Sequence, residues 1–317
     1  MYIGIDIGGT NIKCVLTDET GKVLSSGDTP TSEKAKEIDK SIIALVEKLS
    51  SEAKIDKSRI KAIGIGAAGS IDRKKGMVVT SPNILCWKNY PLAANIEKLS
   101  GIKTFLENDA TVACAGYWWE SHDTKIKTFV MVTLGTGIGG GAVIDGRLFT
   151  GQNGSSMEIG HMSIEANGKE CTCGNRGCFE RYASATALVE FAEANLKKYK
   201  NSNLHNRIKC EKLNSKMIYE EAVKKDELAL KSFDYISGYL GAGIVNIINI
   251  FNPEAVILGG GLSKAHKILI PAVKKIVTER ALKGMKENVK FLAVKDQAII
   301  PALGAAKTAM DRLKHIL

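Results

Sequence analysis

Long apolar runs are absent from this sequence, although 44% of its 317 residues are hydrophobic. A helix that crosses a bilayer needs about 18 or more consecutive apolar residues, and no stretch reaches that length. The first residues, from Met1 to Asp6, place a carboxylate where a secretion signal needs an apolar segment. We therefore expect a cytoplasmic protein that does not associate with membranes. Its length and hydrophobic content can fill the cores of two ordinary domains.

A concentrated basic surface is also absent, although the formal net charge is +10. Lysines and arginines are interspersed with acidic residues at helical spacings through 33–61 and 264–290. A protein that reads a nucleic-acid groove gathers its basic residues on one element, with aromatic residues between them. The dispersed charge is typical of a solvated face, so we expect no nucleic-acid partner. The net positive charge favours anionic substrates such as a nucleotide.

A disulfide framework is a third feature that the sequence lacks. The number of cysteines is odd, at seven, and four of them are far apart in mostly apolar or helical surroundings, which is typical of reduced structural thiols. These four are Cys14, Cys86, Cys114 and Cys210. We therefore expect no disulfide bonds.

The other three cysteines lie together in a segment that begins with Glu158 and ends with Glu180. With one histidine they form the pattern H-x9-C-x-C-x4-C, whose members are His161, Cys171, Cys173 and Cys178. A Cys3His set suits a closed tetrahedral zinc site, and Gly174 and Gly177 let the backbone turn tightly around an ion. An accidental grouping of reduced thiols is the alternative, but cysteines with interleaved glycines rarely fill a core. The pattern predicts a structural Zn2+ without an open coordination position, so any chemistry must come from neighbouring residues.

The pattern of apolar residues and turns is that of an α/β protein in which one device occurs twice. A strand, a glycine turn and a second strand are predicted at 2–7, 8–10 and 12–16, and again at 129–134, 135–140 and 141–144. Further strands are predicted at 62–65, 255–258 and 291–294, and helices at 32–49, after Asp109, at 184–199, at 217–251 and from Leu303. No low-complexity linker marks a domain boundary.

The glycine turns exclude two common nucleotide sites. The G-x-G-x-x-G string at 135–140 formally matches the dinucleotide motif, but a strand and a hairpin follow it, where that fold requires a helix. No G-x4-G-K-[ST] string occurs, so a P-loop is excluded as well. Paired strand–turn–strand loops instead suit a phosphate chain, because glycine lets backbone N–H groups approach anionic oxygens. Thr10 and Thr136 add hydroxyl donors, and Asp6 is a candidate to hold Mg2+ directly or through water.

The segment Asn108-Asp109-Ala110 carries a further carboxylate, and its residues admit two interpretations. Phosphoryl transfer to a hydroxyl needs a carboxylate within reach of the attacking O–H, which makes Asp109 a candidate general base. An Asp before a helical stretch is equally typical of a helix N-cap, and Asn108 is typical of a turn. The residues alone leave both interpretations open.

Taken together, these residues resemble the ROK group (repressors, open reading frames and sugar kinases) of the actin-like ATPase superfamily, over essentially the whole chain. Residues 6–13 are similar to the first phosphate motif of that group, 134–141 to the second and 256–261 to its adenosine motif. Residues 107–110 resemble its catalytic segment, and 158–180 its zinc motif. The resemblance implies ATP-binding contacts from Asp6, Gly8, Gly9, Thr10, Asn11, Lys13, Gly135, Thr136, Gly137, Gly139, Gly140, Gly259, Gly260 and Gly261.

The fold that this resemblance implies is a two-domain actin-like (ribonuclease H-like) ATPase fold with a cleft between the domains. A small α/β domain would comprise 1–118 together with the C-terminal helix 303–317, and a larger α/β domain would comprise 119–302. The implied activity is phosphorylation of a hexose by ATP with Mg2+, and Asp109 is the implied general base.

The resemblance also implies the sugar-binding residues. Glu158, His161 and Glu180 would bind ring hydroxyls, each of which donates and accepts hydrogen bonds. His161 can do so while its other ring nitrogen binds zinc. Further contacts are implied for Gly69, Asn83, Asn108 and Asp109. At 67–70 the chain reads Ala-Ala-Gly-Ser, whereas many glucose kinases of the group have Pro before the Gly.

Glucose, converted to glucose 6-phosphate, is the substrate that the resemblance favours, because the set of Glu158, His161 and Glu180 is complete. N-acetylmannosamine, N-acetylglucosamine and fructose kinases of the group share almost every motif and stay as alternatives. A sugar-sensing protein without catalysis is a further alternative, but repressors of the group carry a winged-helix domain before the first phosphate motif, which here lies within the first residues of the sequence. Members are often homodimers or homotetramers, and the sequence does not distinguish these states.

Overall fold

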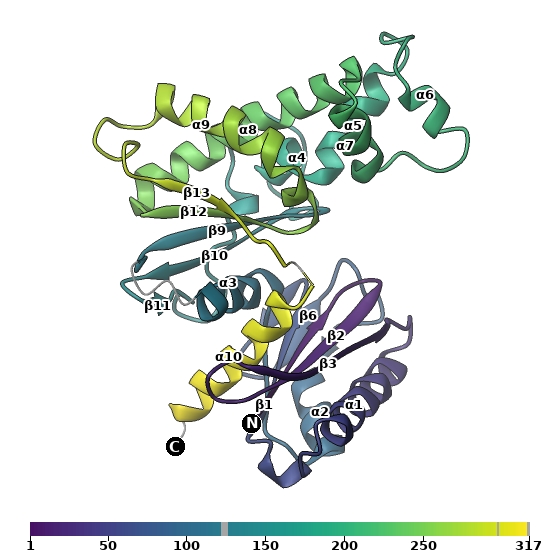
Figure 1. Cartoon of the computed structure of the whole chain (residues 1–317), viewed down its shortest axis with the longest axis vertical. Coiled ribbons are helices and arrows are strands. Elements are labelled where there is room, and N and C mark those ends of the chain that lie inside the picture. The colour runs from purple at the N-terminus through teal and green to yellow at the C-terminus, as the bar shows by residue number, and fades with distance from the viewer. Residues whose placement is uncertain (122–125, 297, 316–317) are drawn as a thin grey trace. The chain divides into compact units, whose positions relative to one another are not determined.

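The structure is a computed structural model that describes residues 1–121, 126–296 and 298–315 (Figure 1). The chain divides into two compact units. Unit 1 comprises Met1–Lys127, Gly141–Met157 and Asp296–Leu317, and unit 2 comprises Thr128–Gly140 and Glu158–Lys295. The domain ranges that the resemblance implies stay a prediction.

A five-stranded sheet forms the centre of unit 1, with the strand order β3-β2-β1-β4-β8. Its strands are β1 (Tyr2–Ile7), β2 (Asn11–Thr17), β3 (Val23–Pro30), β4 (Ala62–Ala67) and β8 (Thr104–Asn108). β1, β4 and β8 run parallel, so their carboxyl ends lie at one edge of the sheet, and β2 and β3 extend the sheet as antiparallel strands. The first glycine turn and Asp109 therefore follow strands that end at the same edge.

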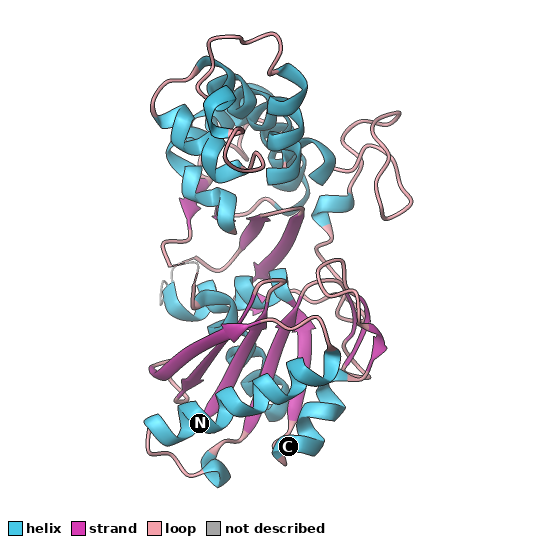
Figure 2. Ribbon diagram, turned by 90° about the vertical axis from the view of Figure 1, so that its right-hand side faces the viewer, coloured by secondary structure: helices cyan, strands magenta, loops and turns pink. Residues whose placement is uncertain are grey.

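The two faces of this sheet pack on different helices, because side chains alternate along a strand. One face carries small residues, and a side chain at Gly4 or Gly64 would collide with the backbone of α10 (Ile300–Lys314). α3 (Asp109–Ser121) packs beside α10. On the other face, isoleucines of β1 and β4 share one core with buried residues of α1 (Ala35–Glu52) and α2 (Leu92–Ser100). Figure 2 shows helices packed along the strands of this sheet.

A small second sheet in unit 1 carries the predicted sugar loop. Its order is β5-β6-β7, and its strands are β5 (Ser70–Asp72), β6 (Met77–Thr80) and β7 (Lys88–Tyr90). Gly69 directly precedes β5, and Asn83 lies between β6 and β7. A single 3-10 turn, η1 (Lys57–Arg59), precedes β4.

The second five-stranded sheet has the order β11-β10-β9-β12-β13. Its parallel strands are β9 (Phe129–Leu134), β12 (Ala255–Gly259) and β13 (Lys290–Ala293). β10 (Ile138–Ile144) passes along the chain from unit 2 into unit 1, where it pairs with β11 (Arg147–Leu148). The helical elements of unit 2 are η2 (Ile159–His161), α4 (Glu180–Ala183), α5 (Ala185–Asn195), α6 (Leu204–Arg207), α7 (Ser215–Val223), α8 (Glu227–Phe251), η3 (Gly261–Ala265) and α9 (His266–Arg280).

The strands around the two glycine turns were predicted with nearly their observed bounds. The strands at 2–7 and 129–134 are confirmed with the predicted limits. The second turn is shorter than predicted, because β10 begins at Ile138 and takes Gly139 and Gly140 into the strand.

The helical stretch predicted over 217–251 contains a break that was not predicted, because the chain forms two helices there. α7 ends at Val223, and α8 begins at Glu227. Lys225 between them has a left-handed backbone with φ of 66°. Asp226 then starts α8 as its N-cap, since its side chain accepts a hydrogen bond from Ala229 N–H at 3.0 Å.

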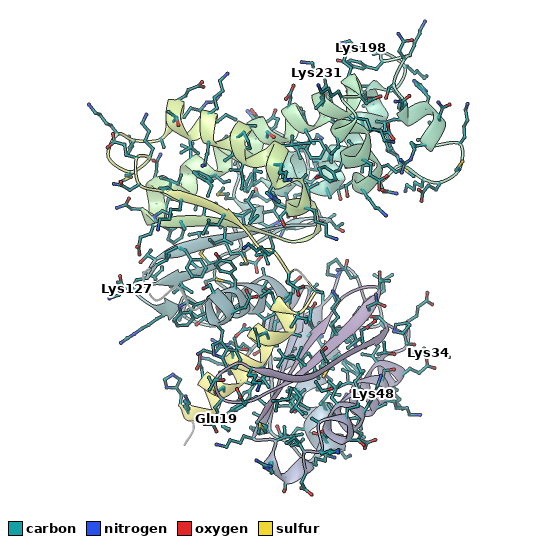
Figure 3. The ribbon with its side chains drawn as sticks, viewed as in Figure 1. Glu19, Lys34, Lys48, Lys127, Lys198 and Lys231 are labelled. Carbon is teal, nitrogen blue, oxygen red and sulfur yellow. The ribbon has the colours of Figure 1, made fainter. Side chains whose placement is uncertain are left out.

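Positive charge is spread over separate elements of both units. Figure 3 labels Lys34 and Lys48 at α1, Lys198 beyond the end of α5 and Lys231 on α8. Three of these lysines, Lys34, Lys48 and Lys231, pair with an acidic residue three or four positions further along the chain, as on solvated helix surfaces. Within the described ranges, no helix has both the length and the apolar character that crossing a membrane requires.

All seven cysteines are free thiols. Cys14 and Cys114 are buried, and burial raises the pKa of both thiols, as expected of structural residues. The same expectation is wrong for Cys86 and Cys210, which are exposed. Cys86 lies in the loop between β6 and β7, and Cys210 lies in a turn after α6.

Candidate active site

The carboxyl end of β8 leads directly into α3, where two neighbouring side chains take different roles. The side-chain oxygen of Asn108 accepts hydrogen bonds from the N–H groups of Ala110 (2.9 Å) and Thr111 (3.2 Å), so Asn108 is the helix N-cap. Asp109 is the first helical residue, and its Oδ1 accepts from Ala110 N–H at 2.9 Å. The capping position therefore belongs to Asn108, and the role of base stays open to Asp109.

The charge of Asp109 influences the ionisation of Asp6. Asp6 lies on β1, directly opposite Lys13 in the β1–β2 hairpin. Burial, followed by the charge of Asp109, raises the pKa of Asp6 to about 7, and Lys13 opposes this shift. Burial also raises the pKa of Asp109, against the effect of nearby backbone N–H groups. A cation beside Asp6 would offset both charges, which fits the predicted Mg2+, and a raised pKa suits a general base.

The first glycine turn closes the hairpin of β1 and β2. Gly8 N–H donates to Asn11 O at 3.0 Å. Thr31, directly after β3, stabilises the turn with two hydrogen bonds. Its hydroxyl donates to Gly8 O at 2.8 Å, and its N–H donates to Thr10 O at 2.9 Å. Gly9 and Thr10 are exposed, so the turn has the accessibility that a phosphate contact requires.

The predicted sugar contacts Asn83 and Gly69 pack against neighbours in unit 1. Asn83 lies beside the first glycine turn, because a Cβ on Gly9 would be 3.2 Å from the Asn83 Cβ. Gly69 has φ of 119°, and a Cβ there would approach the carbonyl oxygen of Thr80 to 2.2 Å. Backbone packing therefore requires glycine at position 69, independently of any sugar contact.

The second glycine loop, between β9 and β10, lies next to Glu180. Gly135 N–H donates to Gly137 O at 3.0 Å and forms the turn. A Cβ at Gly137 would be 2.4 Å from Oε2 of Glu180, so glycine leaves the space that this carboxylate occupies. Thr136 is exposed, and its carbonyl accepts from the Thr186 hydroxyl of α5 at 2.7 Å. The starts of α4 and α5 therefore fix this loop.

The third glycine turn follows β12, the parallel neighbour of β9. Gly260 has φ of 78°, and a Cβ there would be 2.5 Å from the carbonyl oxygen of Leu134, the last residue of β9. Gly259 ends β12, and Gly261 begins η3. The predicted adenosine motif and second phosphate motif are therefore adjacent at the carboxyl ends of parallel strands, where α/β sheets commonly bind ligands.

The four predicted metal ligands converge in unit 2. The ligand atoms of His161, Cys171, Cys173 and Cys178 all lie within 4.8 Å of one another. Nδ1 of His161 is 3.8 Å from Sγ of Cys171, and the Sγ atoms of Cys173 and Cys178 are 3.6 Å apart. A tetrahedral zinc with Zn–S bonds of about 2.3 Å separates its sulfurs by about 3.8 Å. Donor set and spacing therefore fit zinc, and Nδ1 of His161 is the nitrogen that faces the sulfurs.

Backbone conformation and thiol chemistry also favour a cation in this cluster. Gly174 and Gly177 have φ of 91° and 70°, as expected for tight turns between ligands. Burial, followed by the neighbouring thiols, raises the pKa of Cys178 to about 12. A bound cation reverses this preference, because it stabilises thiolates.

Glu180 joins the metal cluster to the second glycine loop. Its Oε1 is 3.3 Å from Sγ of Cys171 and 3.7 Å from Nδ1 of His161. Its Oε2 accepts from Ile138 N–H at 3.4 Å. Glu158 is exposed at the start of η2, just before His161 in the chain. The contact between Glu180 and the glycine loop was not predicted, since neither motif contains a signal for it.

Comparison with known proteins identifies relatives over nearly the whole chain. The sequence model of the ROK family matches residues 2–312. A glucokinase of Thermotoga maritima is 38% identical over 317 residues, which cover 98% of each chain. A xylose repressor of Bacillus subtilis is 30% identical over 316 residues, which cover 99% of this chain and 78% of the repressor.

Solved structures share the fold. The crystal structure of a ROK family glucokinase from Streptomyces griseus, in complex with glucose and AMPPNP, is 32% identical with a TM-score of 0.83. The match covers 98% of this chain and 99% of that one. These comparisons confirm the resemblance to the ROK group and the predicted two-domain actin-like α/β fold class.

Proposed function

The chain belongs to the ROK family, and we propose that it is an ATP-dependent hexose kinase that converts glucose to glucose 6-phosphate. The Thermotoga maritima glucokinase supports this substrate, as does the Streptomyces griseus glucokinase, whose structure contains glucose and AMPPNP. Within this chain, the proposal rests on the end of β8, where Asn108 caps α3 and Asp109 keeps a carboxylate for proton transfer.

The proposed reaction joins the sugar 6-hydroxyl oxygen to the γ-phosphorus of ATP. The bond between that phosphorus and the β–γ bridging oxygen breaks, and ADP leaves. Asp109 accepts the hydroxyl proton, a task that its raised pKa suits. The first glycine turn with Thr10 supplies donors to the phosphates, and Asp6 would hold the Mg2+ that offsets their charge. Positioning and electrostatics supply most of the acceleration in such transfers.

The residues of unit 2 complete the proposed binding functions. The loop at 135–140 would contact phosphate, and 259–261 the adenosine. The zinc is structural in this proposal, because four protein ligands leave no open position. His161 would bind zinc through Nδ1 and offer Nε2 to a sugar hydroxyl, while Glu158 and Glu180 bind further hydroxyls.

A panel of sugars tests the substrate. The formation of ADP from ATP is measured in the presence of glucose, fructose, N-acetylglucosamine or N-acetylmannosamine. Glucose is expected to give the highest kcat/KM, by at least about tenfold. If another sugar of the panel is turned over rapidly and glucose negligibly, that sugar and not glucose is the substrate. Sugar binding without turnover of any member would favour a non-catalytic sugar sensor.

Gly137→Ala is expected to weaken sugar binding in a folded protein. The new Cβ would be 2.4 Å from Oε2 of Glu180 and displaces this flexible carboxylate. The dissociation constant for glucose, measured by calorimetry without nucleotide, should rise about 10- to 100-fold, as for a lost hydrogen bond to a charged group. Gly135→Ala is the control, since a Cβ there meets nothing within 4 Å. Parental affinity in both variants would remove Glu180 from the sugar site.

A further inference from the structure

A buried ion pair directly precedes the candidate base, and the chemistry described above does not use it. Glu107 on β8 has a side chain that is 2% exposed, and its Oε2 lies 2.6 Å from Nε of Arg73, whose side chain is 20% exposed. Oε1 of Glu107 accepts from Asn108 N–H at 3.2 Å. Burial raises the pKa of Glu107, and Arg73 supplies the strongest opposing charge. Arg73 is therefore the main group that favours the ionised form of Glu107 against its burial.

Arg73 also contacts other segments that carry predicted site residues. It follows β5 and lies shortly after Gly69 in the chain. Its aliphatic stem lies against Gly154, where a Cβ would be 2.4 Å from Cδ of Arg73. The segment that contains Gly154 leads along the chain to Glu158. One side chain thus contacts both the catalytic segment and the segment before Glu158.

The C-terminal helix binds main-chain carbonyl groups of β8 and of Arg73. Arg312 on α10 donates from Nη1 to Leu106 O and from Nη2 to Arg73 O, at 3.0 Å each. Its guanidinium carbon also lies 4.8 Å from the ring centre of Phe105 on β8. The planar fork of Arg312 therefore fixes the backbone at Arg73 relative to the backbone of β8.

We propose that Arg73 is a positioning residue of the phosphoryl-transfer reaction, which places Asn108 and Asp109 through its ion pair with Glu107. The kinetic part of this proposal rests on the proposed kinase function, whereas the structural part does not. A reacting group that is displaced by about 1 Å can cost about 100-fold in rate, so a pair adjacent to the base has a large effect without touching substrate.

Arg73→Met keeps an aliphatic stem and removes the ion pair. We expect kcat, per folded protein, to fall about 10- to 100-fold, while KM for ATP stays at the parental value because other residues bind ATP. Arg73→Lys restores a cation within reach of Glu107 and should recover part of the loss. Hydrogen exchange of the backbone amides at 107–111, measured without ligands, should accelerate in Arg73→Met and less in Arg73→Lys.

Lys61→Met is the matched control, since Lys61 forms an ion pair of 2.6 Å with Glu19 on the exposed surface of the same unit. It should change neither kcat nor exchange at 107–111. The proposal is overturned if Arg73→Met keeps the parental kcat and the parental hydrogen exchange at 107–111. It is also overturned if Arg73→Lys recovers none of the lost kcat, or if hydrogen exchange accelerates throughout unit 1. If Arg73→Met does not fold, Arg73→Lys decides: faster exchange confined to 107–111 supports the proposal, and parental exchange overturns it. A parent that phosphorylates no sugar refutes the proposed function alone, and the exchange comparison then decides the role of Arg73.

Discussion

Asp109→Asn is expected to lower kcat for glucose phosphorylation about 10²- to 10⁴-fold, the usual contribution of general base catalysis. Asn keeps the size of the side chain and can still accept from Ala110 N–H through its amide oxygen, and the Asn108 cap of α3 is unchanged. The variant loses only the carboxylate that we propose as the acceptor of the sugar hydroxyl proton. The dissociation constant for glucose, measured by calorimetry, should therefore stay near the parental value.

Asp56→Asn is a matched control for this experiment. Asp56 also accepts a backbone N–H bond, from Ser58 at 2.8 Å, at the start of the short helix η1. The control should keep the parental kcat. A kcat of Asp109→Asn within a few-fold of the parent would exclude Asp109 as the base, and equal losses of kcat and glucose affinity would make it a sugar ligand alone.

Cys173→Ala is expected to remove the metal and to weaken the sugar site with it. The Cys173 side chain is exposed, so the substitution leaves the core packing unchanged. Without one ligand the cluster would bind zinc more weakly, and residues 158–180 would lose the ion that we propose fixes His161 beside Glu180. Zinc, measured by elemental analysis, should fall from one per chain towards zero. The unfolding temperature should fall, and the dissociation constant for glucose should rise about 10- to 100-fold.

Cys210→Ala is the control for the loss of a thiol, because Cys210 is also exposed and lies outside the cluster. It should keep the parental zinc content, unfolding temperature and glucose affinity. Parental zinc content in Cys173→Ala would exclude Cys173 as a ligand. Complete loss of zinc with parental glucose affinity would show that the metal does not shape the sugar site.

Local patterns predicted much of the fold, because the physics that sets those elements is local. Apolar strand residues on both sides of a glycine turn were enough to predict β1 and β2. The break between α7 and α8 was not predicted, because no Gly or Pro marks it. Lys225 makes the turn with its left-handed backbone. The carboxylate of Asp226 accepts a hydrogen bond of 2.9 Å from the hydroxyl of Ser202, a residue from another part of the chain.

In the candidate site, too, contacts within one short segment were predictable, and contacts between distant segments were not. The convergence of His161 with the three cysteines was predictable because all four fall within one short segment, where spacing alone limits which atoms can meet. Tertiary contacts decide the rest. The approach of Glu180 to Gly137 joins segments that are distant in the sequence. Glu107 carried a signal, since a carboxylate after the apolar residues of a strand needs a partner when it is buried. The sequence could not identify that partner as Arg73.

The identity of the product tests the central claim most directly. Purified protein is incubated with ATP, Mg2+ and glucose, and the sugar product is examined by NMR. The account predicts phosphate on the oxygen of C6, formed together with an equal amount of ADP by the parent, and formed about 10²- to 10⁴-fold more slowly by Asp109→Asn. Phosphate on another hydroxyl, or release of ADP without a phosphorylated sugar, would contradict it.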